Sequence, residues 1–212
     1  MKIVVIDYGL GNVQSIKNAL FLCGASEVLL SCKPQEVLSA DGIILPGVGA
    51  FPQGMRELKA RGLVDVLHTY VDSKKPLLGI CLGMQLLFDR GEEFGKTSGL
   101  GLIKGVVERF TEKLNDKLPH IGWNEIQKRD ISWSSGLLRG VCNKEDVYFV
   151  HSYICKPSHP EIILSTTEYG GVEFCSSINQ DNIYACQFHP EKSGNVGLGI
   201  VKNYIEIVQR GV

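Results

Sequence analysis

The 212-residue chain lacks the features of several large protein classes. No apolar run approaches the ~20 residues that a membrane-spanning helix needs, so we expect no association with a membrane. The formal net charge is only −1 and no block of basic residues occurs, which argues against nucleic-acid binding. Internal repeats and low-complexity linkers are also missing. We therefore expect one globular domain over residues 1–212, with two small domains as the alternative.

Paired cysteines are absent as well. The seven cysteines are an odd number, are scattered along the chain and include no Cys-x-x-Cys pair. This pattern argues against a disulfide framework and against a zinc site, and it indicates a reducing compartment. We expect a cytoplasmic protein that binds no metal ion.

The order of apolar segments predicts an α/β fold. In the first half of the chain, short buried-strand patterns alternate with segments of helical spacing. The strands are expected at Lys2–Ile6, Glu27–Leu30, Gly42–Leu45 and directly after Pro76. The helices are expected at Val13–Phe21 (capped by Asn12), Pro34–Leu38 and Met55–Val71 (broken near Gly62).

The second half of the chain has a different pattern, because no long helix is expected before its end. Residues 92–105 are rich in glycine and predict a loop. Short strands are expected at Val106–Phe110, Glu125–Gln127, Val147–Val150, Ile162–Ser165, Val172–Ser176 and Ile183–Phe188, and a closing helix at Val196–Val208, capped by Ser193. The whole pattern predicts an open, mostly parallel sheet flanked by helices, with antiparallel strands added in the C-terminal half.

The segment Pro76–Phe88 contains the strongest functional signal. A short apolar run passes through Gly79-Ile-Cys81-Leu-Gly83 into straight-chain residues that favour a helix. A strand that turns sharply into a helix at a nucleophile, with glycine two residues to either side, is a nucleophile elbow. The N–H groups at the start of that helix would favour the thiolate form of Cys81. A buried structural cysteine is the alternative.

The loop Pro46–Phe51 is a candidate oxyanion hole. It follows a predicted strand and contains two glycines, at the end of the sheet where open α/β proteins bind their ligands. Its backbone N–H groups could hold a developing negative charge, although a plain turn would show the same pattern.

A cysteine nucleophile needs a base, and the base needs an orienting partner. His189 follows an apolar strand, and Glu191 lies two residues later, beyond a proline. The carboxylate of Glu191 could hold the imidazole in the tautomer that accepts a proton, while a solvated loop is the alternative. His120 and His151 are further candidates for the base.

These segments together resemble a known family. Gly79–Gln85 combined with Gln187–Glu191 resembles the class I (triad) glutamine amidotransferases, whose fold is flavodoxin-like. The resemblance covers nearly the whole chain. Within that family the chain more closely resembles the glutaminase subunits of imidazole glycerol phosphate synthases, through Asp7–Asn12, Pro46–Phe51, Pro119–Asn124, Tyr148–Tyr153 and His189–Ser193.

The resemblance implies a role for each matching residue. Cys81 would attack the side-chain amide of L-glutamine, with His189 as acid/base and Glu191 as its orienting partner. The oxyanion would be held by backbone N–H groups of Leu82 and of Gly47, Val48 or Gly49. The substrate would be bound by Gln85, Glu93, His151, Ser152 and Tyr153. Hydrolysis through a cysteinyl thioester would need no cofactor.

The resemblance also implies a heterodimer with a synthase subunit of the (βα)8-barrel type. That cyclase would receive ammonia through a channel and make imidazole glycerol phosphate and AICAR in histidine biosynthesis. Free ammonia is mostly protonated at neutral pH, which would destroy its nucleophilicity. The interface residues would be Asn12, Trp123, Tyr148 and Lys192. The glycine loop could rest with its N–H turned away until the synthase docks.

Three alternatives remain open. A homologous glutaminase subunit could feed ammonia to a different synthase, such as one that aminates a sugar for surface polysaccharide. A stand-alone cysteine hydrolase, such as a γ-glutamyl hydrolase or a peptidase, would need no synthase. A non-catalytic binding subunit could keep the same scaffold.

Overall fold

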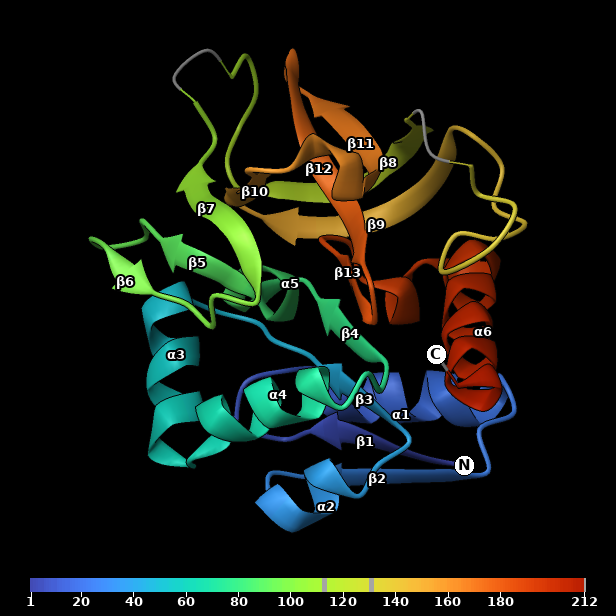
Figure 1. Cartoon of the computed structure of the whole chain (residues 1–212). Helices are drawn as coiled ribbons and strands as arrows, with labels where there is room; N and C mark the ends of the chain where they lie inside the picture. The colour runs from blue at the N-terminus through green and yellow to red at the C-terminus, as the bar shows by residue number, and fades with distance from the viewer. Residues whose placement is uncertain (112–113, 130–131, 212) are drawn as a thin grey trace.

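The computed structural model describes residues 1–111, 114–129 and 132–211 (Figure 1). The strands are β1 (Lys2–Ile6), β2 (Glu27–Ser31), β3 (Gly42–Leu45), β4 (Leu77–Ile80), β5 (Phe88–Gly91), β6 (Thr97–Ser98), β7 (Ile103–Arg109), β8 (His120–Lys128), β9 (Glu145–His151), β10 (Tyr153–Pro157), β11 (Ile163–Tyr169), β12 (Val172–Gln180) and β13 (Ile183–Cys186). The helices are α1 (Val13–Leu22), α2 (Pro34–Leu38), α3 (Phe51–Ala60), α4 (Leu63–Asp72), α5 (Leu82–Leu86) and α6 (Gly194–Arg210), with short 3-10 helices η1 (Pro160–Ile162) and η2 (Pro190–Lys192).

The parallel half of the sheet has the strand order β2-β1-β3-β4-β13. This is the order of flavodoxin-like folds, in which ligands bind beyond the carboxyl ends of the strands. Strands β3, β4 and β13 are buried along their whole length, which explains why each reads as a continuous apolar run. The predicted α/β fold with a mostly parallel sheet is confirmed.

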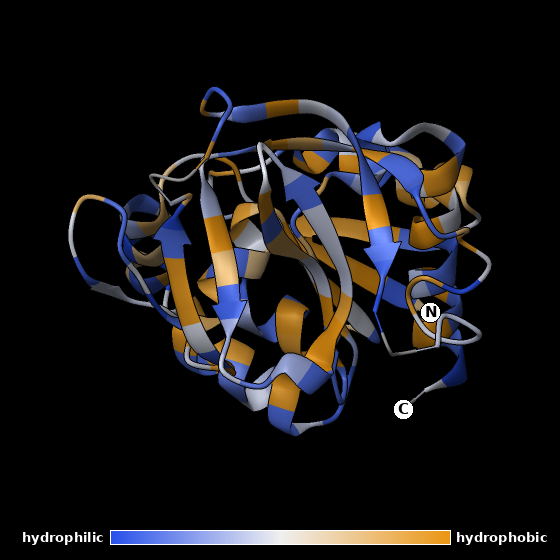
Figure 2. Ribbon diagram, turned by 90° about the horizontal axis from the view of Figure 1, so that it is seen from above, coloured by the Kyte–Doolittle hydropathy of each residue, from blue (hydrophilic) through white to orange (hydrophobic). Residues whose placement is uncertain are grey.

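Helices cover both faces of this parallel half, and each face has its own core. Ile3 and Val5 of β1 pack in a cluster with apolar residues of α1 and α6. Val4 and Ile6 point to the opposite face, where they pack with residues of α2, α3 and α4. Successive side chains of a strand point to opposite faces, so a run without polar residues indicates burial on both sides. In Figure 2 hydrophobic stretches lie along the interior strands, while the turns at the periphery are largely hydrophilic.

Antiparallel strands extend the sheet in the second half of the chain, as predicted. Strand β12 pairs antiparallel with β13 and continues the sheet toward β10, β7, β5 and β6. A branch leaves β12 through β11 to β8 and β9. In Figure 1 this extension stands above the parallel half, and the end of β4 and the start of α5 lie where the two parts meet. Residues from both parts can therefore reach one site.

Several local predictions were wrong. Residues 92–105 are not one loop, because they contain β6 and the first residues of β7. Strand β8 begins at His120, five residues before the predicted start, and β10 was not predicted at all. Ser193 does occupy the residue before α6, but its hydroxyl does not cap that helix. Asn12 likewise precedes α1 without a side-chain cap.

Among the described residues, no helix combines the length and the apolar character that crossing a membrane requires.

Candidate active site

Cys81 lies at a sharp turn between β4 and α5. Its backbone has φ 54° and ψ −114°, a conformation that residues with side chains rarely adopt and that often marks a functional site. Gly83 faces the end of β3, where a Cβ atom would lie 1.8 Å from the carbonyl oxygen of Leu45. At Gly79 a Cβ atom would come within 3.0 Å of the Met84 Cα atom. The packing thus requires glycine two residues before and two residues after Cys81.

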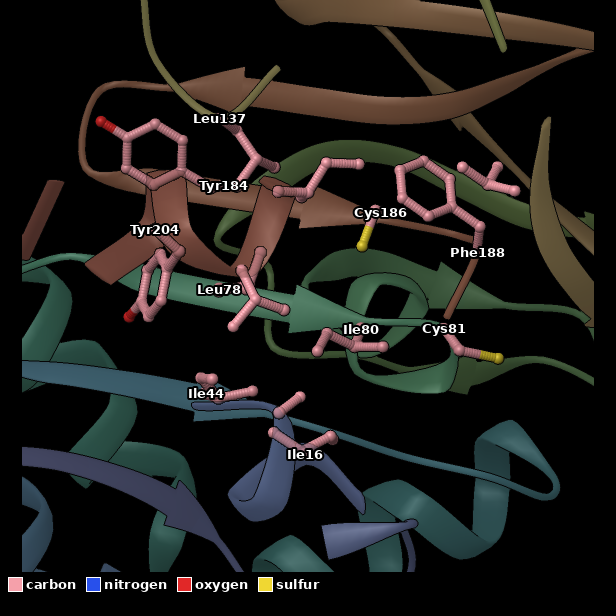
Figure 3. Close-up of a cluster of buried hydrophobic side chains, with 14 of the residues drawn as sticks. Ile16, Ile44, Leu78, Ile80, Cys81, Leu137, Tyr184, Cys186, Phe188 and Tyr204 are labelled. Carbon is pink, nitrogen blue, oxygen red and sulfur yellow. The ribbon is translucent and has the colours of Figure 1, made fainter. Parts of the chain in front are cut away.

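The sulfur of Cys81 has polar neighbours. The buried amide of Gln187 donates to it from 3.6 Å, and the carbonyl oxygen of Val150 lies 3.8 Å away. In Figure 3 the sulfur points away from the apolar side chains of Ile80 and Ile16. Cys81 is 6% exposed and borders a cavity, so the alternative of a sealed structural cysteine does not fit.

His189 and Glu191 form a buried pair beside this sulfur. The imidazole Nδ1 lies 2.9 Å from Glu191 Oε1, and the two side chains are 2% and 1% exposed. Burial by itself lowers the pKa of His189, but the nearby Cys81 sulfur and the Glu191 carboxylate raise it to about 10. The carboxylate accepts the Nδ1 proton, which leaves Nε2 as the reactive nitrogen. Nε2 has no hydrogen-bond partner among the described residues, and catalytic hydrogen bonds often tighten only when substrate binds.

Backbone contacts fix the segment that carries His189. Its N–H donates to the carbonyl of Tyr148 on β9, and its own carbonyl accepts a hydrogen bond of 2.6 Å from the hydroxyl of Ser193. The Ser193 hydroxyl in turn accepts from the N–H of Tyr148. This use of the hydroxyl explains why Ser193 cannot cap α6.

A cavity of about 330 Å³ opens over Cys81. Its walls combine residues from both parts of the sheet and from the glycine loop. They are Val48, Gly49, Cys81, Leu82, Gln85, Glu93, Pro119, Val150, His151, Ser152 and Tyr153. All five predicted substrate-binding residues and three of the four predicted oxyanion residues therefore border one cavity. The sequence reasoning did not select Pro119 and Val150 as site residues.

Gly47, the fourth predicted oxyanion residue, is buried beneath the cavity. A Cβ atom there would lie 2.6 Å from the Tyr8 hydroxyl oxygen and 2.8 Å from Leu82 Cβ. Tyr8 donates its hydroxyl proton to the carbonyl of Pro46 at 2.8 Å, which holds the start of the glycine loop. At the other end of the loop, Glu93 accepts a hydrogen bond of 2.7 Å from the N–H of Phe51.

Gln85 and Gln187 connect the cavity wall to the sulfur. The Gln85 amide nitrogen donates to the carbonyl of Tyr153 at 3.2 Å and to Gln187 Oε1 at 3.0 Å. Gln187 then donates to Cys81, as described above. Gln187 and Tyr8 lie within the motifs but have no role that the sequence predicts, because their function depends on contacts across the fold.

The predicted interface residues lie in two places. Trp123, 57% exposed, stands edge-on to the ring of Tyr148, with the ring centroids 6.2 Å apart. The ammonium of Lys192 lies 5.7 Å from the centroid of the Tyr148 ring, and that ring lies 6.5 Å from the ring of His189. Asn12 precedes α1, which contacts the segment η2. Three of the four residues thus form one patch next to His189.

Within the described part of the chain, no group of three or more histidine, cysteine, aspartate or glutamate side chains is arranged to hold a metal ion. All seven cysteines are free thiols.

Comparison with known proteins finds relatives that match nearly the whole chain. The model of the family "Glutamine amidotransferase class-I" matches residues 4–206. The imidazole glycerol phosphate synthase subunit HisH of Streptococcus sanguinis is 48% identical over 97% of this chain and 96% of its own. The subunit HisH of Bacillus cereus strain G9842 is 46% identical over 98% of this chain and 95% of its own.

Solved structures share the fold at low sequence identity. A crystal structure of a glutamine amidotransferase superposes with a TM-score of 0.73 at 18% identity and covers 97% of this chain and 98% of its own. The structure of PurLQS from Thermotoga maritima gives a TM-score of 0.71 at 15% identity and covers 99% and 97%.

Proposed function

The chain belongs to the class-I glutamine amidotransferase family, and from this premise we propose how it acts as the glutaminase subunit of an imidazole glycerol phosphate synthase. It hydrolyses L-glutamine to glutamate and ammonia and passes the ammonia to a synthase subunit. The observation that carries this proposal is a cavity over Cys81 with the buried pair of His189 and Glu191 next to that cysteine, in a chain nearly half identical to HisH subunits. The family match over residues 4–206 also supports a single domain.

The reaction divides into two steps at the cysteine. The Cys81 thiolate attacks the side-chain carbonyl carbon of glutamine, and a C–S bond forms. The C–N bond then breaks as His189 gives its Nε2 proton to the departing nitrogen, which leaves as ammonia. A γ-glutamyl thioester remains. His189 next takes a proton from water, the resulting hydroxide attacks the thioester, and glutamate and the thiolate are released.

Glu191 keeps His189 in its working tautomer. Its carboxylate faces Nδ1 at 2.9 Å, so Nε2 is left to exchange protons with the substrate. The same negative charge stabilises the imidazolium that precedes ammonia release. This is the role that the orienting acid has in catalytic triads.

Backbone N–H groups stabilise the negative charge of the tetrahedral intermediate. Leu82 is the first residue of α5, directly after the nucleophile, and the loop Gly47–Gly49 lies beside it. Loss of one such donor typically raises the barrier by ~2.7–4 kcal/mol. The glycine loop therefore controls the rate, and its orientation is a means of regulation by the synthase.

The cavity distinguishes the two ends of the substrate. The carboxylate of Glu93 borders the cavity and suits the α-ammonium group of glutamine. Gln85 has committed its amide N–H groups to Tyr153 and Gln187, so its carbonyl oxygen is the atom free to accept a hydrogen bond from that ammonium group. The backbone of His151, Ser152 and Tyr153 forms the opposite wall.

The synthase docks on the patch of Trp123, Tyr148 and Lys192, with Asn12 at its margin. Aromatic residues such as Trp123 and Tyr148 are enriched at interfaces. The patch lies next to His189, the residue that releases ammonia, so a short channel into the other subunit can keep ammonia from bulk water. A (βα)8-barrel cyclase is the partner that we propose, in a cytoplasmic heterodimer.

Purified protein tests this proposal. Glutamine hydrolysis is measured for the chain alone and with the cyclase subunit of the same organism, in the presence of the cyclase substrate. We expect low activity alone and strong stimulation in the complex, and deletion of the gene should make growth depend on histidine. Full activity without any synthase would favour a stand-alone hydrolase, and growth of the deletion strain without histidine would indicate a different acceptor of ammonia.

A further inference from the structure

Two buried histidines link β8 to the cavity wall. Strands β8 and β9 pair so that His120 lies directly opposite His151. Their side chains meet, with His120 Nδ1 3.2 Å from His151 Nε2. Neither ring belongs to the catalytic pair of His189 and Glu191, but His151 borders the cavity.

The two histidines are part of a series of hydrogen bonds, and the atoms at its two ends determine where each proton lies. His151 Nδ1 lies 2.9 Å from the carbonyl oxygen of Tyr153, which can only accept a hydrogen bond. Nδ1 of His151 therefore carries the proton. Since a neutral imidazole has one proton, His151 Nε2 is an acceptor, and the donor to it is the Nδ1–H of His120.

Asn124 fixes the other end. Its amide oxygen accepts a hydrogen bond of 2.8 Å from the N–H of Glu125, and its amide nitrogen donates to the carbonyl of Glu168 at 2.8 Å. The same nitrogen lies 3.4 Å from His120 Nε2, which has no proton and accepts. All hydrogen bonds thus run in one direction, from Asn124 through His120 and His151 to Tyr153.

Aromatic packing holds both rings in place. The ring of His120 stacks between those of Tyr169 and Phe149, with centroid distances of 3.9 and 4.9 Å. The ring of His151 packs against Phe174 and Phe110 at 5.0 and 5.3 Å. Burial in these surroundings lowers the pKa of His120 to about 4 and that of His151 to about 3, so both rings are neutral at physiological pH.

The carbonyl of Tyr153 connects this series of hydrogen bonds to the active site. It accepts from His151 Nδ1 and also from the amide of Gln85. Gln85 continues to Gln187, which donates to the sulfur of Cys81. If His151 lost its donor from His120, it could place its proton on Nε2, and the carbonyl of Tyr153 would lose one of its two donors.

We propose that His120 is a positioning residue for glutamine binding: its Nδ1–H fixes the tautomer of His151, which fixes the Tyr153 carbonyl and the amide of Gln85 in the cavity wall. The inference deepens the proposed function and rests on it, because it assigns the wall to glutamine. His120 itself touches no substrate.

Two substitutions separate the hydrogen bond from the packing. His120→Phe keeps a ring between Tyr169 and Phe149 but removes the donor to His151. His120→Asn restores an amide N–H close to the place of Nδ1. Asn124→Ala, farther from the core, leaves both rings in place, removes the donor to His120 Nε2 together with the side-chain hydrogen bonds to Glu168 and Glu125, and serves if His120→Phe does not fold. Each variant is studied in complex with its synthase, and its thermal unfolding midpoint is recorded.

Three measurements are made on each variant. Steady-state kinetics gives KM for glutamine and kcat separately. Inactivation rates are compared for 6-diazo-5-oxo-norleucine, a glutamine-like electrophile, and for iodoacetamide, which needs only the thiolate. The ¹⁵N spectrum of the histidine rings in the free chain reports which nitrogen of His151 carries the proton.

For His120→Phe we expect KM to rise by about tenfold, the effect of one buried hydrogen bond, with kcat little changed. Inactivation by the diazoketone should slow in proportion, alkylation by iodoacetamide should not, and the Nδ1 proton of His151 should no longer be fixed. His120→Asn should recover most of the loss, and Asn124→Ala should show a smaller rise in KM.

A KM within twofold of wild type in a folded His120→Phe variant would overturn the inference, as would equal slowing of both inactivation reactions. Wild-type protein that reacts with iodoacetamide but not with the diazoketone would overturn the glutamine assignment and the inference together. The two failures are distinct, since only the second concerns the wild-type protein.

Discussion

Gly197 and Pro190 are so close that a Cβ atom on the glycine would lie 2.0 Å from the carbonyl oxygen of the proline. Gly197 belongs to the second turn of α6, and Pro190 connects His189 to Glu191. The long C-terminal helix is thus packed directly against the backbone of the proposed acid/base pair.

Gly197→Ala should therefore displace the segment that carries His189. We expect a loss of stability of about 1–3 kcal/mol, as for other overpacked sites, together with a fall in kcat. Gly199→Ala is the matched control in the same helix, because a Cβ atom there meets nothing within 4 Å. It should stabilise by ~0.5–1 kcal/mol through helix propensity and leave kcat unchanged. Urea unfolding measures the stability of each variant, and glutamine hydrolysis measures its kcat. Equal changes in stability and kcat for the two variants would contradict the prediction.

Glu191→Gln tests the orienting carboxylate and has a defined pH dependence. The pKa of His189 in the folded chain, about 10, lies above its ordinary value of 6.5. The stabilisation from its protonated form is therefore complete below pH 6.5 and is lost as the pH rises toward 10. The substitution should cost more unfolding free energy at pH 6 than at pH 10, and it should lower kcat by about 10³–10⁴-fold. An equal cost at both pH values would show that the imidazolium is not paired with Glu191.

Glu93 accepts a hydrogen bond from the N–H of Phe51 and is proposed to bind the α-ammonium group of glutamine, and substitution can separate these two roles. Glu93→Gln keeps an oxygen that accepts from the N–H of Phe51 but loses the negative charge. We expect a higher KM for glutamine, since the α-ammonium group loses its counter-charge, with kcat nearly unchanged. Glu93→Ala loses both contacts and should also lower kcat, because the end of the glycine loop is released. Steady-state kinetics distinguishes the two variants, and an unchanged KM in Glu93→Gln would exclude a role in binding the ammonium.

Tyr8 holds the glycine loop from below. Tyr8→Phe leaves the buried carbonyl of Pro46 without its donor, which should cost about 1–3 kcal/mol of stability and lower kcat. Tyr204→Phe is the control: this buried hydroxyl donates to the carbonyl of Ile43, away from the cavity. It should lose similar stability without loss of kcat at temperatures where both variants are folded. A normal kcat for Tyr8→Phe would show that the loop needs no such support.

Trp123→Ala should weaken binding of the synthase by at least about tenfold, as expected for an aromatic anchor at an interface. Since Trp123 is 57% exposed, the substitution should hardly alter stability. Leu22→Ala provides an exposed apolar control, 74% exposed at the end of α1. Titration of the synthase with each variant, read by stimulation of glutamine hydrolysis, measures the effect. Equal affinity of both variants would place the interface elsewhere.

The elements with strong local patterns were predictable from sequence. The strand Lys2–Ile6 and the helix Pro34–Leu38 have the predicted bounds, because each is a run with one clear period or start signal. The short strand β6 was missed, since it is formed by pairing with β5 and not by propensity. Strand β10 was missed because only one residue separates it from β9.

Some residues of the site were also predictable from sequence and others were not. Cys81 and His189 stood out because glycine spacing and adjacent sequence mark them. The contribution of Gln187 or of Tyr8 depends on which side chains meet across the sheet, and no spacing in the sequence records that. The Ser193 hydroxyl shows the limit clearly. Its position before a helix predicted a cap, but tertiary hydrogen bonds to His189 and Tyr148 use the hydroxyl instead.

The parallel part of the sheet and its antiparallel extension contribute different residues to the active site. The parallel strands β4 and β13 lead to Cys81 and to His189, the proposed nucleophile and acid/base, whereas the antiparallel extension supplies the cavity wall at His151–Tyr153. The proposed catalytic groups and Gln85 therefore lie with the parallel strands, whereas the remaining recognition of the substrate lies mainly on the extension. Directed evolution confined to the extension should retarget the protein to other amides while the thiolate keeps its intrinsic nucleophilicity.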